Sequence, residues 1–134
     1  MRTLFAMLAV LLLCTFAEGA DAAPAGGLKI TEMAVTTKIT RNNPIDAVRR
    51  ISHRSVKTLY CFTRIVNPSG EDQPIRHVWY QNGQVAGEQE LQVKGSKWRT
   101  WSQRPVNDAS VGAWRVEARD AGGKVLKAVE FTIN

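Results

Sequence analysis

The chain has 134 residues, of which 44% are hydrophobic and 22% are charged, with ten glycines and five prolines. This composition is typical of one compact globular domain and excludes a fibrous or an intrinsically disordered protein. Because 18 basic residues stand against 12 acidic ones, the formal net charge is +6 and anionic partners are favoured.

The first part of the chain has the pattern of an export signal. Met1 and Arg2 give a positive start, an apolar run follows at residues 4–16, and small residues lead up to Ala22. This pattern predicts a secretory signal peptide over residues 1–22, cleaved after Ala22, and a short linker over residues 23–27. The apolar run is shorter than the roughly 20 residues of a spanning helix, so we expect a periplasmic or secreted protein that associates with a membrane at most at its surface.

Cleavage changes the charge and the cysteine count. Loss of Arg2, Glu18 and Asp21 leaves 17 basic and 10 acidic residues, so the net charge moves from +6 to +7. Loss of Cys14 leaves Cys61 as the single cysteine of the mature chain, which rules out an internal disulfide. The mature protein must therefore fold on its hydrophobic core alone.

From residue 28 to residue 134 the sequence is typical of an all-β domain. Short stretches rich in Val, Ile, Thr, Trp and Phe are separated by turn signals, and no stretch keeps a helical period for long. We predict an immunoglobulin-like antiparallel β-sandwich of about seven strands. The expected strands are Leu28 to Ile39, Val56 to Val66, Ile75 to Gln81, Gln84 to Val93, Lys97 to Gln103, Ala113 to Asp120 and Lys124 to Ile133.

The turns support this interpretation. The dipeptide Asn82-Gly83 is preferred in two-residue hairpins, because both positions need a positive φ. We expect further hairpins at Gly95-Ser96 and at residues 121–123, and either of the longer links, residues 67–74 or 104–112, could carry the chain from one sheet to the other. The segment NNPIDAVRRIS, residues 42–52, carries a capping residue followed by proline and predicts a helical turn or two.

Alternation assigns the faces of the strands. Trp114 and Val116 point one way while Arg115 and Glu117 point the other, which is the pattern of a half-buried strand. Val129, Phe131 and Ile133 likewise share one face, and the two strands should form one side of the core. Neither face of residues 75–81 is polar throughout, so a central strand is expected there.

The stretch KWRTWSQR, residues 97–104, contains two tryptophans at odd spacing. Because the strand period is two, Trp98 and Trp101 lie on opposite faces, so one should join Trp79 and Trp114 inside while the other lies outside near Arg99. An exposed indole beside arginines can stack on a sugar ring, so Arg99, Trp101 and Arg104 are candidate ligand-binding residues. The alternative is a structural surface aromatic covered by Arg99.

Several motifs resemble one uncharacterised family. They are Cys61-Phe62-Thr63, His77-Val78-Trp79, the stretch from Trp98 to Ser102, the stretch from Gly112 to Val116, and the stretch from Gly123 to Leu126. In this order, over roughly residues 59 to 133, the chain resembles the bacterial family called domain of unknown function twenty-nine-fourteen. The resemblance implies a small domain carried by bacterial exported or membrane-attached proteins, with no established activity.

The candidate reactive residues predict no catalysis. Cys61 lies between Tyr60 and Phe62 and is typical of a small buried hydrophobe, although His77 on the next strand could approach it across the core. For His77 we expect a structural role, hydrogen-bonded to a backbone carbonyl or a hydroxyl. The sequence contains no closely spaced pair of metal-ligating residues of the kind that structural zinc sites use. We therefore expect no metal site, and we expect neither enzymatic activity nor a cofactor.

The segment from Arg41 to Lys57 is strongly basic, with five basic residues and one acid. Arg49, Arg50 and Arg54 in this segment are candidate partner-binding residues for an anionic envelope component or an acidic protein face, unless the segment is merely a solvated loop. Nucleic acid is not expected as a partner of an exported protein. Two hypotheses remain: a noncatalytic interaction module that binds a protein or envelope partner, and a small-ligand or glycan-binding module.

Overall fold

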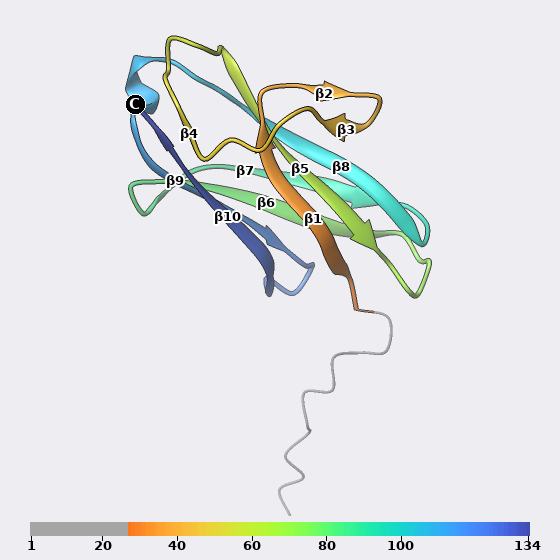
Figure 1. Ribbon diagram of the computed structural model, residues 1–134. Helices are drawn as coiled ribbons and strands as arrows, with labels where there is room; N and C mark the ends of the chain where they lie inside the picture. Colours follow the sequence, from red (N-terminus) through yellow and green to blue (C-terminus); the bar gives the residue numbers. More distant parts are fainter. Residues whose placement is uncertain (1–26) are drawn as a thin grey trace, which may run out of the picture.

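The computed structural model describes residues 27–134, which form two β-sheets packed face to face (Figure 1). The three-stranded sheet has the order β1-β5-β8, with β1 at Lys29–Thr36, β5 at Thr58–Val66 and β8 at Lys97–Pro105. The five-stranded sheet has the order β4-β10-β9-β6-β7, with bounds Arg50–Ile51, Val125–Ile133, Gly112–Arg119, Gln73–Gln81 and Gln84–Val93. The predicted immunoglobulin-like sandwich is confirmed.

Three short elements complete the fold. The strands β2, Ile39–Thr40, and β3, Asn43–Pro44, form a small hairpin, and a 3₁₀ turn spans Asp108–Ser110. Within residues 27–134 no helix is long and apolar enough to cross a membrane. The predicted signal peptide, residues 1–22, lies outside the described residues, as does most of the linker at 23–27.

The seven predicted strands correspond to β1 and to β5 through β10. Strand β6 pairs with β9 on one side and with β7 on the other, as expected for a central strand. Strands β9 and β10 pair antiparallel, with Trp114 opposite Phe131, and so form one wall of the core. Strand β4 pairs with β10 in parallel, over Thr132 and Ile133.

The turns follow the expectations with one exception. Asn82 has a φ of 51° and Gly83 a φ of 81°, which confirms the two-residue hairpin between β6 and β7. The hairpin between β9 and β10 is also confirmed. The hairpin predicted at Gly95-Ser96 is wrong, because this turn joins β7 in one sheet to β8 in the other. The carbonyl of Ser96 accepts a hydrogen bond from Asn67 at the end of β5, where a second connection crosses between the sheets.

The helical turn predicted in residues 42–52 is also wrong, since this segment forms β3 and β4. The Asp46 carboxylate accepts hydrogen bonds from the Thr36 hydroxyl at 2.6 Å and from the Thr37 backbone and hydroxyl at 2.9 and 2.7 Å. Further on, the Val48 amide donates to the Val35 carbonyl, and the Arg49 carbonyl accepts from Thr132. The last two bonds give backbone N–H and C=O groups of this segment partners on other strands, in place of the partners that a helix would have supplied within the segment.

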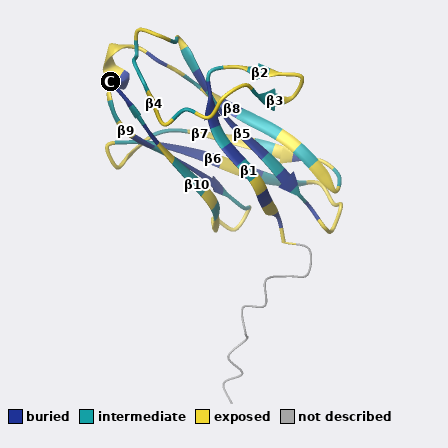
Figure 2. Ribbon diagram, in the orientation of Figure 1, coloured by how far each residue is buried: buried dark blue, intermediate teal, exposed yellow. Residues whose placement is uncertain are grey.

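An aromatic cluster occupies the centre of the core. The ring centroids of Trp79, Trp114 and Phe131 lie 5.9 to 6.3 Å apart, with Trp79 edge-on to the other two. Both buried indole N–H groups have acceptors: Trp114 donates to the Ser110 carbonyl at 2.7 Å and Trp79 to the Ser102 hydroxyl at 3.0 Å. Figure 2 shows buried residues along the strands of both sheets.

The β2–β3 hairpin adds cover to the outer side of the three-stranded sheet. Phe62 alternates with the inward-facing Cys61 and Thr63, so it points outward, yet it is fully buried and lies outside the core cluster. The guanidinium of Arg64 stands 5.8 Å from the Phe62 ring and donates to the Asn43 side-chain oxygen of the hairpin at 3.1 Å. The hairpin therefore fixes the arginine that lies over this apolar side chain.

Candidate functional site

The reactive side chains form a hydrogen-bonded chain inside the sandwich. His77 Nδ1 lies 2.7 Å from the Ser102 hydroxyl, and its Nε2 lies 3.3 Å from the Thr63 hydroxyl. Thr63 donates its proton to the Thr100 carbonyl at 3.1 Å, so its oxygen accepts from Nε2–H. Nδ1 is then the acceptor for the Ser102 proton, and the Trp79 indole completes the chain by donating to Ser102. The neutral Nε2–H tautomer satisfies every member.

This arrangement is structural. A serine beside an imidazole resembles a nucleophile with its base, but His77 is fully buried and Ser102 nearly so, which leaves no room for a substrate. Burial lowers the pKa of His77 to about 4 and raises the pKa of the Cys61 thiol far above its ordinary value. The interpretations of His77 as a histidine bonded to hydroxyls and of Cys61 as a buried small residue are confirmed.

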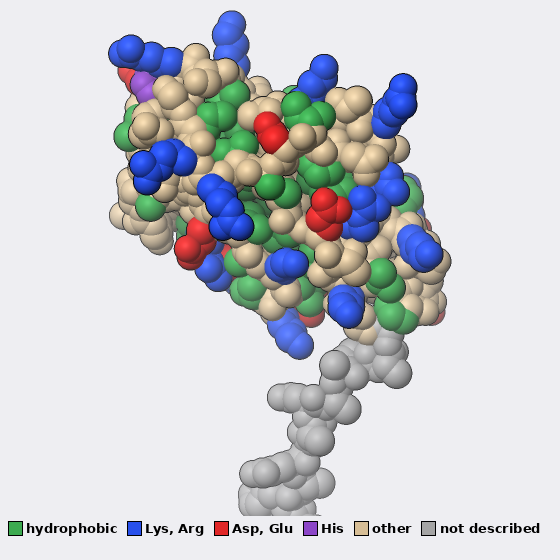
Figure 3. Space-filling view, viewed as in Figure 1, with side chains coloured by type: hydrophobic (Ala, Val, Ile, Leu, Met, Phe, Trp, Pro, Cys, Tyr) green, Lys and Arg blue, Asp and Glu red, His purple; other side chains and the backbone are tan. Residues whose placement is uncertain are grey.

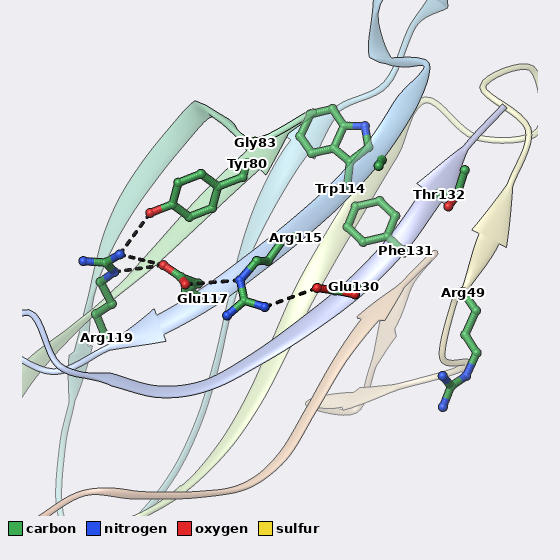
Figure 4. Close-up of a pocket in the computed structure, with 11 residues that line it drawn as sticks. Arg49, Tyr80, Gly83, Trp114, Arg115, Glu117, Arg119, Glu130, Phe131 and Thr132 are labelled. Carbon is green, nitrogen blue, oxygen red and sulfur yellow. Dashed lines mark hydrogen bonds and ion pairs between the residues drawn. The ribbon is translucent and has the colours of Figure 1, made fainter.

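A shallow hollow of about 660 Å³ lies over β9 and β10 on the outer face of the five-stranded sheet (Figure 4). Glu117 stands at its centre and accepts from Arg119 at 2.6 Å and from Arg115 at 3.2 Å. Arg115 also reaches Glu130 at 3.3 Å, and Arg119 donates to the Tyr80 hydroxyl at 3.0 Å. These four charged residues largely neutralise one another.

The carboxylate of Glu117 is held in its charged form by this network. Its side chain is only 11% exposed. Burial alone would raise the pKa of Glu117, but the hydrogen bonds from Arg119 and Arg115 bring that pKa below its ordinary value. The centre of the hollow is therefore a closed ion-pair cluster, and free charge lies at its margin.

Arg49 borders this hollow and stands apart from the linked cluster (Figure 4). Arg49 and Arg50 are exposed beside the edge of the five-stranded sheet, while their neighbours Val48 and Ile51 pack against the core. Arg54 is exposed on the following turn, where its amide bonds to the Ser52 hydroxyl at 3.2 Å. We call Arg49, Arg50 and Arg54 the basic edge.

The basic edge carries unpaired charge. None of the ion pairs within residues 27–134 involves Arg49, Arg50 or Arg54. Figure 3 shows basic side chains spread widely over the face on which β1, β4 and β10 lie, with fewer acidic ones between them. The structure thus places all three sequence-predicted partner residues at the surface, on one short stretch of chain.

The candidate ligand-binding residues are only partly brought together. Arg99 is exposed and Trp101 is half-buried on the outer face of β8, while Trp98 packs against the core cluster from the inner side. The prediction of one inner and one outer tryptophan is confirmed. Arg104 does not join the outer pair, because it lies at even spacing from Trp98 and shares its side of the strand.

The surroundings of Arg104 are unusual. A Cβ added at Gly87 would overlap the Arg104 guanidinium, so this guanidinium lies directly against β7. Within residues 27–134, Arg104 Nε is the one buried side-chain nitrogen or oxygen without a hydrogen-bond partner. The prediction that Arg104 binds a ligand together with Arg99 and Trp101 is therefore wrong. The Arg104 side chain runs between the two sheets instead.

The residues that do join Arg99 and Trp101 come from other strands. Register places Arg64 directly opposite Arg99 and Phe62 opposite Trp101. Arg64 also pairs with Glu32 at 3.1 Å. Sequence reasoning missed Arg64, because only the β5–β8 register brings it here. The cation–π contact lies between Arg64 and Phe62 rather than at Trp101.

Metal binding finds no support in the geometry. Among residues 27–134 no group of three or more histidine, cysteine, aspartate or glutamate side chains is placed to hold a metal ion.

Comparison with protein families identifies the second half of the chain. Residues 72–133 match the family described as Protein of unknown function (DUF2914). These residues of the chain are similar to DUF2914. This segment contains β6 to β10 with Arg99 and Trp101, whereas the basic edge lies before it. No curated protein sequence matches the chain.

Solved structures share the fold of this chain. An immunoglobulin-like protein from Pseudomonas aeruginosa matches with a TM-score of 0.56 at 10% identity, covering 81% of this chain and 98% of that one. A β-glucosidase 3B from Thermotoga neapolitana, in complex with glucose, matches with a TM-score of 0.52 at 12% identity, covering 81% of this chain but 16% of the glucosidase. At such identities the likeness shows the fold alone.

Proposed function

We propose that the protein is a noncatalytic exported interaction module that binds a protein or an anionic envelope partner through the basic edge. The observation that carries this proposal is the placement of Arg49, Arg50 and Arg54, which are exposed and outside the ion pairs of the described chain. Unpaired guanidinium groups can bind carboxylates or phosphates without first breaking an internal contact.

The backbone of the same segment supports a binding role. Strand β4 has only two residues and pairs with β10 at the edge of the five-stranded sheet, and Val48, two residues before β4, donates to the Val35 carbonyl of β1. A rigid support reduces the entropy that a loop would lose on binding. The Ser102–His77 pair is engaged inside the core, which supports a function in binding rather than in turnover.

The energetics favour a salt-dependent contact. Each exposed ion pair contributes roughly 0.2–1 kcal/mol, so three guanidiniums together contribute about 1–3 kcal/mol to such an interface. Screening over about 8–10 Å at physiological ionic strength should weaken that contribution. Retention of the partner should therefore fall as salt is added.

Charge reversal tests the proposal. We expect Arg49→Glu/Arg50→Glu to reduce co-purification of envelope partners at low salt, while Lys94→Glu/Lys124→Glu, an equal charge change at two other exposed lysines, leaves it intact. Circular dichroism should show that both variants remain folded. Equal losses in both variants would mean that only net charge matters, and retention in both would exclude the basic edge.

A second candidate function is binding of a small ligand or glycan on the outer face of β8. The exposed cation Arg99 beside the half-buried Trp101 favours it.

A further inference from the structure

A cluster of positive charge lies on the outer face of the three-stranded sheet. Arg64 on β5 is directly opposite Arg99 on β8. Lys97 lies two residues before Arg99 in β8, on the same face. Only Arg64 of these three takes part in an ion pair within residues 27–134. Because Glu32 already neutralises Arg64, Arg99 and Lys97 are the cations of this face that no ion pair of the described chain compensates.

The cations border a hollow of about 770 Å³ that also has an aromatic wall. Trp101 lies two residues from Arg99 on the same face of β8, and its indole is half-buried. Asn42, from the tip of the β2–β3 hairpin, lies on the rim together with Thr31. We call this site the Trp101 hollow. No acidic side chain lines it, although Glu32 pairs with Arg64 nearby.

The hairpin tip is held in a fixed position over the hollow. Arg41 and Asn42 both have left-handed φ values, 52° and 60°, as the two-residue loop between β2 and β3 requires. Asn43 stabilises the tip by accepting from Arg64 at 3.1 Å and by donating to the Arg41 carbonyl at 3.2 Å.

We propose that the Trp101 hollow binds an acidic saccharide. The apolar face of the sugar ring would rest on Trp101, and its carboxylate, sulfate or phosphate would sit between Arg99 and Lys97. The Asn42 amide and the Thr31 hydroxyl supply polar contacts for ring hydroxyls. Aromatic stacking alone would accept a neutral sugar, whereas the unpaired cations select an acidic one. This inference rests on the second candidate function and not on the basic edge, which lies on the other sheet.

Titration followed by nuclear magnetic resonance tests this inference on the mature chain. The protein has four tryptophans, so its spectrum should contain four indole N–H signals, and Trp101→Phe identifies the one that belongs to the hollow. Tetragalacturonate, an acidic oligosaccharide, should shift the Trp101 signal and leave those of Trp79 and Trp114 in place. Maltotetraose, a neutral one, and inorganic phosphate should bind at least tenfold more weakly.

Arg99→Thr separates a binding role from a structural one. It should weaken tetragalacturonate binding at least tenfold and leave the midpoint of urea unfolding unchanged, because Arg99 takes part in no ion pair of the described residues. Arg76→Thr, which removes an exposed arginine of β6, should leave binding unchanged. A variant that both loses binding and becomes less stable would indicate a merely structural Arg99 and contradict the proposal.

Three other outcomes would overturn the inference. Maltotetraose binding as tightly as tetragalacturonate would remove the role of the cations. Phosphate binding as tightly would leave only an adventitious anion site. No shift of the Trp101 signal at millimolar tetragalacturonate would show that the hollow binds no acidic saccharide.

Discussion

Acidification should destabilise the fold through His77. Burial lowers the pKa of His77 to about 4, whereas an unfolded chain restores a value near 6.5. Between these two pKa values, the His77 imidazole binds a proton in the unfolded state but not in the folded state. Stability from this group is fully present above pH 6.5, falls as the pH drops from 6.5 toward 4, and is lost below that range. The shift corresponds to about 3 kcal/mol, at about 1.4 kcal/mol per pH unit.

Urea unfolding followed by tryptophan fluorescence measures this loss. Between pH 6.5 and 4.5 the free energy of unfolding should fall with a slope approaching about 1.4 kcal/mol per pH unit. His77→Gln should be less stable at pH 7 but should lose most of this slope, and His53→Gln, which alters the other histidine, should keep it. A wild-type protein with constant stability across this range, or an unchanged slope in His77→Gln, would refute the assignment of a buried neutral imidazole.

Three further substitutions test the packing. Ser102→Ala leaves His77 Nδ1 and the Trp79 indole without partners and should cost about 2–5 kcal/mol in chemical denaturation, whereas a loss below about 1 kcal/mol would contradict the network. Phe62→Ala should cost about 3–5 kcal/mol and speed hydrogen exchange in the β2–β3 hairpin; a surface-like cost would show that the hairpin does not cover this ring. Arg104→Met removes a buried, unpartnered nitrogen and should leave the melting temperature unchanged or raise it, and a marked fall would reveal a missed partner.

The strands were predictable because their signals are local. Alternation with a period of two and the turn residues at Asn82-Gly83 and at 121–123 lie within each strand or hairpin, so seven strands were expected close to their observed bounds. Strand β4 has only two residues, and its partner β10 lies about eighty residues later in the chain. The cap-and-proline pattern around Asn43 favoured a helix locally, but the Asp46 carboxylate accepts hydrogen bonds from Thr36 and Thr37 at the end of β1 instead.

The candidate sites were predictable to a similar extent. Odd and even positions of β8 point to opposite sides of the sheet. This alternation separates Trp98 from Trp101, places Arg99 on the same side as Trp101, and places Arg104 on the side of Trp98. Arg64 could not be added from the sequence, because its position depends on the register between β5 and β8. The partners of His77 likewise depend on which strands face one another, and a hydroxyl partner was expected without its identity.

Photo-crosslinking in intact cells tests the central claim most directly. A photoreactive amino acid replaces Arg50 in one variant and Gln89, exposed on β7 at the opposite edge of the same sheet, in another. If the basic edge is the binding surface, position 50 should give a discrete crosslinked partner that disappears when Arg49→Glu is added, while position 89 should give none. The same product from both positions, or a product at position 50 that is indifferent to Arg49→Glu, would contradict an interaction module that works through this edge.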